Sequence, residues 1–367
     1  MGTRRKNDAR VAQHRRRQPH PKDCALPARC DSCDVIDLGQ INDDPDAMDA
    51  PVGAPHAYAR PLWPLGSLLP RHWFSNAHAY PLYPRDAVQS YLHDRHVDLG
   101  YRSGYSRQQA AKSVACFHNE TGSIWTHLIG FVGFVAFGLA TLAGWTTPSE
   151  AGWPARVGLA CYAAGVAGCF LFSTLFHTFG CVNRGSFVHY GCLDYAGISL
   201  LMSTATLVAL HYTHYCAPVW TVHVPFSALT VLLSLPGVLG PTLIPPWPTA
   251  SWHMYRTLVY VAAGAVSAAP LLHHAWSMWG VDAALGSQLW WVARGFMVVA
   301  ILNSTGALVY VAKVPERFAP GRLDYGVTSH QLWHAVIVVS AAVHAYTCIQ
   351  LIEWRILGQG RLECPIM

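Results

Sequence analysis

Seven long apolar stretches, separated by short connections rich in Pro, Gly and Trp, constrain this chain more than any other feature. Each stretch is about 18–24 residues long, the length that an α-helix needs to cross the hydrocarbon core of a bilayer. They are expected near 126–145, 157–179, 190–211, 219–239, 256–275, 289–311 and 330–352. Pro236 lies near the end of the fourth stretch and is expected to kink or end that helix. The sequence therefore predicts an all-α membrane protein, a seven-transmembrane helix bundle.

Composition supports a membrane protein and excludes other classes. Of the 367 residues, 52% are hydrophobic and 12% are charged, and that charged share is about half that of a typical soluble domain. The chain is too apolar for a disordered protein and too poor in charge for an ordinary soluble enzyme. Most of its Lys and Arg residues lie before Trp125. They accompany no recognition helix or aromatic-basic platform, so we expect no nucleic-acid partner.

The parts of the chain outside the spans divide by composition. Residues 1–85 carry Arg, Pro, Asp and His without periodicity and are expected to form a disordered, basic, Pro-rich arm. The arm contains Cys24, Cys30 and Cys33, too few ligands for a closed zinc site. Residues 86–125 are expected to hold one or two amphipathic juxtamembrane helices. The seven-span domain covers 126–352, and 353–367 form a short extracytoplasmic tail.

Orientation follows from the distribution of positive charge, because cytoplasmic loops are enriched in Lys and Arg. A cytoplasmic N-terminus places the basic arm inside, together with Arg184, Arg256, Lys313, Arg317 and Arg322. The outside then holds Arg156, Arg355 and Arg361. The sequence therefore predicts a cytoplasmic N-terminal arm. It leaves open whether the host is the plasma membrane or an endomembrane.

Ionisable and polar side chains interrupt three of the predicted spans. Each ionisable group within a span costs roughly 2.5–3.5 kcal/mol on insertion scales and so requires a reason. Ser173 and His177 lie four residues apart at the end of the second span, on one helical face. Asp194 lies about a turn inside the third span. His330 and His334 open the seventh span at the same i, i+4 spacing.

The topology brings these groups to one side of the membrane, because an even-numbered span ends where an odd-numbered span begins. Three imidazoles beside a carboxylate match a catalytic zinc site, which keeps its fourth position for water. We expect zinc to be held by His177, His330 and His334. Asp194 would orient or deprotonate the water, and Ser173 would hydrogen-bond the water or a substrate carbonyl.

Simpler roles are open for every histidine. A histidine in a span is often a packed residue that is hydrogen-bonded to a neighbouring helix. The pairs His211 with His214 and His273 with His274 fall at the opposite membrane face. We expect these four to be interface residues, with an accessory metal site as the lesser alternative.

Three segments resemble the progestin and adipoQ receptor family, and most closely its adiponectin receptor branch. They read CFHNETGSIWTHLIGF, LFSTLFHTFG followed by LDYAGISLL, and KVPERFAPGRLDYGVTSHQLWHAVIVVSAAVHAY. The resemblance covers about 113–352 and implies seven helices, a cytoplasmic N-terminus and a zinc near the cytoplasmic face. It implies His177, His330 and His334 as ligands and Asp194 as the carboxylate that positions the zinc water. Ser173 completes the pattern of a wider superfamily that includes alkaline ceramidases.

The chain departs from the family pattern at two places beside the expected site. It reads Cys181-Val182-Asn183 where the family often has His-Ser, and Ser123 where the family often has Asn. Neither departure removes an expected ligand. Both affect the rim around the site.

Two functions from different classes follow. The first is a zinc-dependent intramembrane hydrolase of a lipid amide such as ceramide, with a role in lipid metabolism. The second is a signalling receptor whose zinc is purely structural, with an extracellular protein or a steroid as ligand. An ion or zinc transporter fits less well, because the ionisable groups gather at one face. A G-protein-coupled receptor is disfavoured, because its N-terminus would lie outside.

Overall fold

The computed structural model describes residues 81–215, 217–244, 247, 252–277 and 283–357. Most of the predicted arm, including Cys24, Cys30 and Cys33, lies outside the described residues, as does most of the predicted tail. Within the described residues the secondary structure is almost entirely helical, apart from one isolated bridge between Tyr83 and Tyr101.

Seven helices of the described part are long and apolar enough to cross a membrane, which confirms the predicted fold class. They are α2 (Thr121–Leu142), α3 (Gly152–Phe179), α4 (Arg184–Thr213), α5 (Val224–Leu243), α6 (His253–Ser277), α7 (Ala283–Ala312) and α8 (Ser329–Leu357).

Several helix boundaries differ from the sequence-based placement by a few residues, as at the starts of α2, α4 and α7. Helix α2 begins at Thr121 rather than near 126, so its polar first turn belongs to the helix. Helix α5 continues through Pro236 and Pro241, so of the two expected outcomes at Pro236 the end of the helix is wrong, and the kink stays a prediction. Proline removes a main-chain donor, but transmembrane helices tolerate it where packing and Ser or Thr hydroxyls satisfy freed carbonyls.

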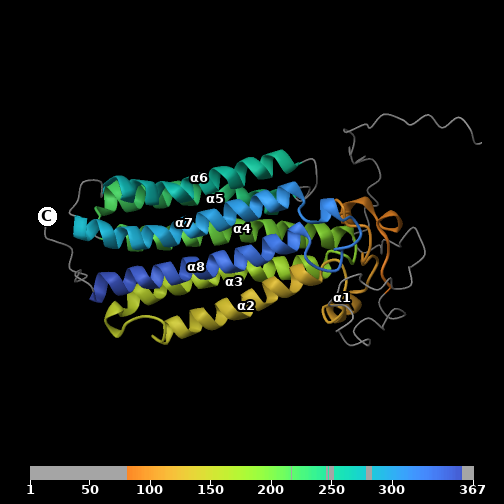
Figure 1. The fold of residues 1–367 in the computed structure, drawn as a ribbon, viewed down its shortest axis with the longest axis horizontal. Helices are drawn as coiled ribbons and strands as arrows, with labels where there is room; N and C mark the ends of the chain where they lie inside the picture. Colours follow the sequence, from red (N-terminus) through yellow and green to blue (C-terminus); the bar gives the residue numbers. More distant parts are fainter. Residues whose placement is uncertain (1–80, 216, 245–246, 248–251, 278–282, 358–367) are drawn as a thin grey trace, which may run out of the picture. The chain divides into compact units, whose positions relative to one another are not determined.

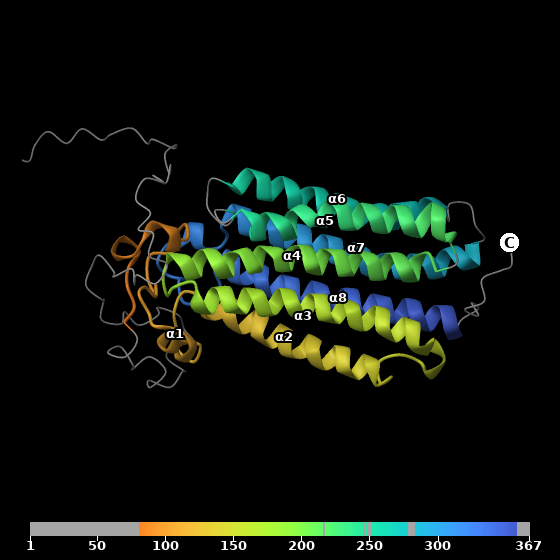
Figure 2. The same ribbon diagram turned by 180° about the vertical axis from the view of Figure 1, so that it is seen from behind.

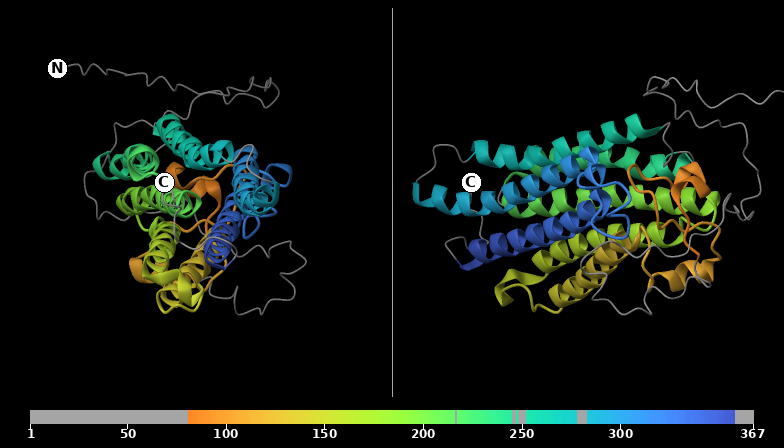
Figure 3. Two further views of the ribbon diagram at one scale, coloured as in Figure 1. Left: turned by 90° about the vertical axis from the view of Figure 1, so that its left-hand side faces the viewer. Right: turned by 45° about the vertical axis from the view of Figure 1, so that its right-hand side comes forward.

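The helices pack as neighbours around α3 and α8. Helix α3 lies between α2 and α4, and α5 and α6 continue the bundle from α4 (Figures 1 and 2). Helix α7 packs on α8, and α8 also lies against α2, α3 and α4 (Figure 3). Helix α3 is the most buried of the seven and α8 the next, so side chains on their facing surfaces are shielded from lipid.

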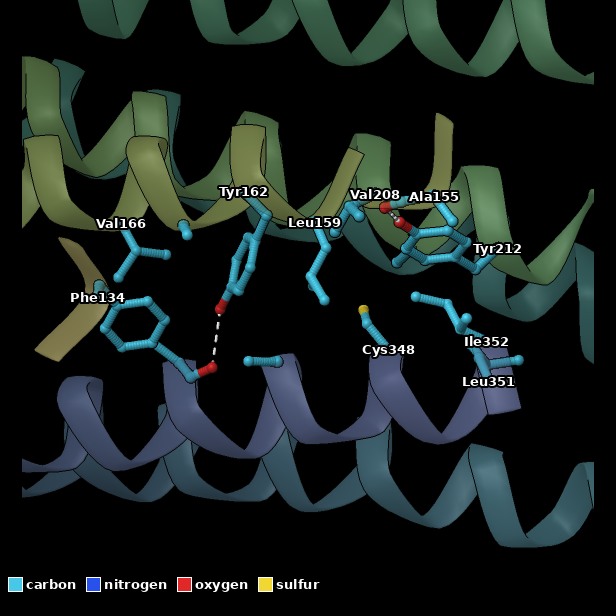
Figure 4. Packing of buried hydrophobic residues seen from close by; sticks show 14 of the residues in the cluster. Phe134, Ala155, Leu159, Tyr162, Val166, Val208, Tyr212, Cys348, Leu351 and Ile352 are labelled. Atoms are coloured by element: carbon cyan, nitrogen blue, oxygen red, sulfur yellow. Dashed lines mark hydrogen bonds between the residues drawn. The ribbon is translucent and has the colours of Figure 1, made fainter. Parts of the chain in front are cut away.

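An apolar core fills the space between α2, α3, α4 and α8. Figure 4 shows Leu159 and Tyr162 of α3 near Phe134 of α2 and Cys348 of α8. The Tyr162 hydroxyl donates to the Ala341 carbonyl of α8 at 2.9 Å. Buried tyrosines keep a polar partner for the hydroxyl while the ring contributes apolar area, so this contact fixes α3 against α8.

The residues just before α2 cover one end of the bundle. We call residues 81–120 the juxtamembrane segment. It contains two short 3₁₀ turns and one helix, α1 (Arg107–Ser113), and otherwise has irregular structure. The Asp324 carboxylate, in the α7–α8 connection, accepts main-chain N–H groups of Asp98 and Leu99 at 3.0 and 2.8 Å. The segment is thus attached to the chain that leads into α8.

Candidate metal centre

Three histidine rings converge at the end of the bundle that the juxtamembrane segment covers. His177 comes from the last turn of α3, and His330 and His334 come from the beginning of α8. The Nε2 atom of His330 lies 3.3 Å from that of His177 and 3.1 Å from that of His334. All three ligand atoms lie within 4.8 Å of one another. His177 and His334 are buried and His330 is half-buried.

These separations fit a metal ion with nitrogen ligands. Zinc–nitrogen bonds of 2.0–2.1 Å in a tetrahedron place neighbouring nitrogens about 3.3–3.4 Å apart. The two Nε2 separations, 3.3 and 3.1 Å, are close to that value. Neutral imidazole is the commonest metal ligand in proteins, and the hard ions calcium and magnesium prefer oxygen. The triad could therefore hold a metal ion of the imidazole-binding kind.

The start of α8 is held by a buried carboxylate that orients its two histidines. Glu316, in the connection from α7, is fully buried. It accepts the main-chain N–H of Ser329 at 2.7 Å and also the Ser329 hydroxyl. An acidic group at a helix N-terminus satisfies free N–H groups and complements the helix dipole. The i, i+4 spacing then places His330 and His334 on one face of α8.

Ser173 and Asp194 lie beside the triad rather than in it. Ser173 is buried one turn before His177 on α3. It is hydrogen-bonded to the carboxylate of Asp194 on α4, and that carboxylate interacts electrostatically with His177. The fold thus brings together all five residues that the sequence singled out. The chemical roles of Asp194 and Ser173 stay predictions.

Glu120 also lies at the site, although it was not among the residues expected there. Its Oε2 atom lies 2.8 Å from Nδ1 of His177, across 57 residues of chain. Glu120 is the N-cap residue of α2, yet its side chain makes no capping bond and turns to His177 instead. Burial alone would raise the pKa of Glu120, but the hydrogen-bonded His177 imidazole holds that pKa below its ordinary value. A carboxyl directly before an apolar span is the signal that could have identified it.

His127 is a second residue that the sequence analysis did not single out. Its ring is buried and stacks on the His334 ring, with centroids 3.8 Å apart and planes 23° apart. The Phe170 ring also packs against the His127 ring, with centroids 4.7 Å apart. Glu120, Ser123 and His127 follow the i, i+3, i+7 spacing of one helical face. That polar face at the start of an apolar span was the available signal.

The juxtamembrane segment contributes two further buried groups. The Arg102 guanidinium donates to the His177 carbonyl at 2.5 Å and to the Ser113 hydroxyl at 2.7 Å. The Nδ1 atom of His118 accepts the main-chain N–H of Glu120 at 3.1 Å. Burial, together with the nearby Arg102 charge, holds the pKa of His118 well below its usual range. No periodic pattern pointed to either residue, because this segment is mostly irregular.

The two departures from the family pattern pack into the rim of the site. Cys181 and Val182 form a small buried cluster with residues of the juxtamembrane segment. Asn183 caps α4, because its side-chain oxygen accepts the Ser186 main-chain N–H at 2.7 Å. Ser123 is buried in the first turn of α2. The rim around the triad is therefore closed by packing and capping at these positions.

At the opposite end of the bundle His214 meets His273 and His274, whereas the His211 ring lies against Tyr212 and Tyr215. The Nε2 atom of His214 lies 3.1 Å from Nδ1 of His273, which joins α4 to α6. The His274 ring lies 5.2 Å from that of His214. Within the described residues, three or more candidate ligands gather closely enough for a metal only at His177, His330 and His334. The role of these four histidines as interface residues stays a prediction.

Comparisons with known proteins agree on one family. The model of the Haemolysin-III related family matches residues 115–345. The chain is 27% identical to "Progestin and adipoQ receptor family member 3" of Mus musculus over 75% of this chain and 87% of that protein. It is 30% identical to "Heptahelical transmembrane protein 1" of Arabidopsis thaliana over 73% of this chain and 80% of that protein. It is 28% identical to "Adiponectin receptor protein" of Drosophila melanogaster over 70% of this chain and 55% of that protein. The chain therefore belongs to the haemolysin-III-related family of seven-helix membrane proteins that includes the progestin and adipoQ receptors.

Proposed function

We propose that this protein is a zinc-dependent hydrolase of a lipid amide, with ceramide as the favoured substrate. The observation that carries the proposal is the composition of the site. Three imidazoles converge on one point, and a carboxylate stands beside them, hydrogen-bonded to Ser173. Zinc that is catalytic in proteins is held by three such ligands with one position open for water or substrate.

The position of each residue suggests its chemical role. Zinc bound at the triad would supply Lewis acidity toward the amide carbonyl and toward a water molecule. Asp194, adjacent to His177, would accept a proton from that water and return it to the departing amine. The Ser173 hydroxyl donates to Asp194 and so fixes the orientation of its carboxylate. His177, His330 and His334 would hold the ion, and His177 interacts electrostatically with Asp194.

The position of the site favours a lipid as substrate. His177 lies in the last turn of a spanning helix, and His330 and His334 lie in the first turns of another. The site is therefore near the depth where a bilayer lipid carries its polar linkage. Acyl chains would remain among apolar helices, because α5 and α7 expose large hydrophobic side chains such as Leu232, Leu243, Leu308 and Val311. An amide between a polar head and two long chains meets these conditions.

The test is release of free sphingosine from ceramide by detergent-purified protein, measured together with zinc per chain. We expect Asp194→Ala to lose roughly 100-fold or more in rate while it keeps its zinc. His177→Ala is expected to lose both rate and zinc. Asp98→Asn is the control, because this exposed carboxylate lies outside the site. Equal rates for wild type and Asp194→Ala would contradict the mechanism.

A signalling receptor with a structural zinc is the second candidate. One observation favours it: the triad joins α3 to α8, two helices far apart in the sequence. Several relatives also carry the word receptor in their names. In that case His334→Ala would lower thermal stability and ligand binding at the outer loops, while wild-type protein would release no sphingosine. The two assays on the same preparations distinguish the candidates.

The N-terminus is proposed to be cytoplasmic. The support is the excess of Lys and Arg in the arm and in the loops on its side. An epitope inserted near residue 10 should be reached by antibody only after cells are permeabilised, and an epitope after residue 367 should be reached without permeabilisation. The reverse pattern would contradict this orientation.

A further inference from the structure

Two contacts from the juxtamembrane segment end on a single metal-ligand candidate. Glu120 accepts a hydrogen bond from Nδ1 of His177 at 2.8 Å, and Arg102 donates to the His177 carbonyl at 2.5 Å. One contact orients the ring and the other fixes the main chain of the same residue. His177 is buried, so water does not replace either partner.

We propose that Glu120 and Arg102 are positioning residues for His177, and that the metal affinity of the triad therefore depends on the juxtamembrane segment outside the spans. The inference rests on the proposed function, because it assumes that the triad binds a metal. It assigns the segment a role in the metal centre itself, in addition to covering the end of the bundle.

The geometry at Glu120 assigns it a role behind the ligand rather than in the ligand set. Its carboxylate meets Nδ1, whereas the atom of His177 that faces His330 is Nε2. A carboxylate on Nδ1 keeps the proton on that nitrogen and leaves the Nε2 lone pair for the metal. It also raises the basicity of the imidazole as a ligand. Glu120 thus selects the tautomer that the triad requires.

Arg102 acts on the helix end. His177 lies in the last turn of α3, where main-chain carbonyls lack helical partners. The guanidinium reaches the carbonyls of His177 and Thr178, at 2.5 and 3.4 Å. A cation at a helix C-terminus also complements the helix dipole. Without this contact, the last turn of α3 would be free to fray and to move the His177 ring away from its partners on α8.

The turn that carries Glu120 is itself attached to the other half of the site. His118 accepts the main-chain N–H of Glu120, and Gln331 of α8 donates to the Asn119 carbonyl at 2.7 Å. Gln331 is the neighbour of His330 in the sequence. A Cβ atom on Gly122 would meet the Gln331 side chain at 2.7 Å, so α2 and α8 approach closely here. The segment therefore sets His177 and His330 relative to each other.

The experiment measures zinc affinity by chelator competition on the purified full-length chain. We expect Glu120→Ala to bind zinc about 10–100-fold more weakly than wild type, the usual effect of removing such a partner. Glu120→Gln should lose less, because its amide oxygen still accepts from Nδ1. Arg102→Met should weaken binding in the same range. Asp98→Asn should bind as wild type does, because it removes an exposed carboxylate of the same segment that lies outside the site.

A second readout separates positioning from general stability. Cobalt loaded in place of zinc gives visible bands that report ligand geometry. These bands should shift in Glu120→Ala, return toward wild type in Glu120→Gln, and stay unchanged in Asp98→Asn. If Glu120→Ala does not fold, the comparison of Glu120→Gln and Arg102→Met with Asp98→Asn decides the question.

The outcomes distinguish this inference from the proposed function. Wild-type protein that binds zinc, with Glu120 and Arg102 variants of equal affinity and equal cobalt spectra, overturns the inference alone. Folded wild-type protein that binds no zinc overturns the proposed function and this inference with it. Weaker binding and altered spectra in the Glu120 variants, with an unchanged Asp98→Asn, support the positioning role.

Discussion

Glu316 offers the sharpest test of how the start of α8 is held. Its carboxylate is fully buried and accepts two hydrogen bonds from Ser329, one from the main-chain N–H at 2.7 Å and one from the hydroxyl. Ser329 is the first residue of α8, and His330 follows it directly. Removal of the carboxylate leaves a buried N–H at a helix N-terminus without its acceptor. The first turn of α8 then loses its anchor.

The expected cost follows from these contacts. A hydrogen bond to a charged group contributes about 1.5–3 kcal/mol, and an acidic group at a helix N-terminus adds about 0.3–1 kcal/mol. Two such bonds outweigh the cost of burying the carboxylate, so we expect Glu316→Ala to lower the free energy of unfolding by about 3 kcal/mol. Glu316→Gln should lose about half as much, because its single amide oxygen replaces only one acceptor. Ser329→Ala should lose about 1 kcal/mol, because it removes only the hydroxyl.

Unfolding can be followed in detergent by the reaction of a thiol-specific dye with Cys169 and Cys348, which are buried in the native state. The expected order of stability is wild type, Ser329→Ala, Glu316→Gln and then Glu316→Ala. Zinc affinity should fall in the same order, because His330 lies in the turn that Glu316 holds. The reasoning is refuted if Glu316→Ala unfolds within about 0.5 kcal/mol of wild type, a change typical of neutral surface substitutions.

Two further predictions concern the packing of α3 on α4 and the attachment of the juxtamembrane segment. A Cβ atom on Gly197 would meet the Cys169 main chain at 2.9 Å, so Gly197→Ala should lower the free energy of unfolding by about 1–3 kcal/mol and slow sphingosine release. Gly133→Ala is the control, because a Cβ atom there would have open space around it. Equal stability of the two variants would contradict this packing. Burial raises the pKa of Asp324, although its carboxylate accepts two main-chain N–H groups. The native state therefore binds the Asp324 proton more tightly than the unfolded chain does. The stability that this protonation contributes falls as pH rises through the native-state pKa. Asp324→Asn should therefore match or exceed wild-type stability near pH 8 and lose this advantage near pH 4, as measured by dye-reported unfolding at both pH values; a less stable variant at pH 8 would show that the charged form is the favoured one.

The sequence was enough for the bundle and for the ligand candidates because both depend on local periodicity. Apolar length specifies a span, and the i, i+4 spacing specifies a helical face, so His330 and His334 could be assigned to one face from sequence alone. His177 could be placed near them because an even-numbered span ends on the side of the membrane where an odd-numbered span begins. Asp194 stood out because an ionisable group within a span is costly.

The contacts around the triad could not be predicted in the same way. Glu120 and Arg102 reach His177 across 57 and 75 residues of chain. Such contacts depend on how an irregular chain folds over the bundle, which no spacing rule specifies. The continuation of α5 through Pro236 was missed for a related reason: proline weakens an isolated helix, but neighbouring helices and hydroxyl groups compensate within a bundle.

The two carboxylates near the triad bear on whether its metal would be catalytic or structural. A structural zinc site is usually closed by a fourth protein ligand. Glu120 is engaged with Nδ1 of His177, on the opposite side of the ring from Nε2, and Asp194 is engaged with Ser173. Within the described residues, the candidate ligand group holds the three histidines and neither carboxylate. Two acids therefore stand next to the site without completing it, although each costs energy to bury. A clamp between α3 and α8 would gain from a fourth ligand, whereas hydrolysis requires an open position with a base beside it, and this composition supports the proposed hydrolase over the proposed structural site.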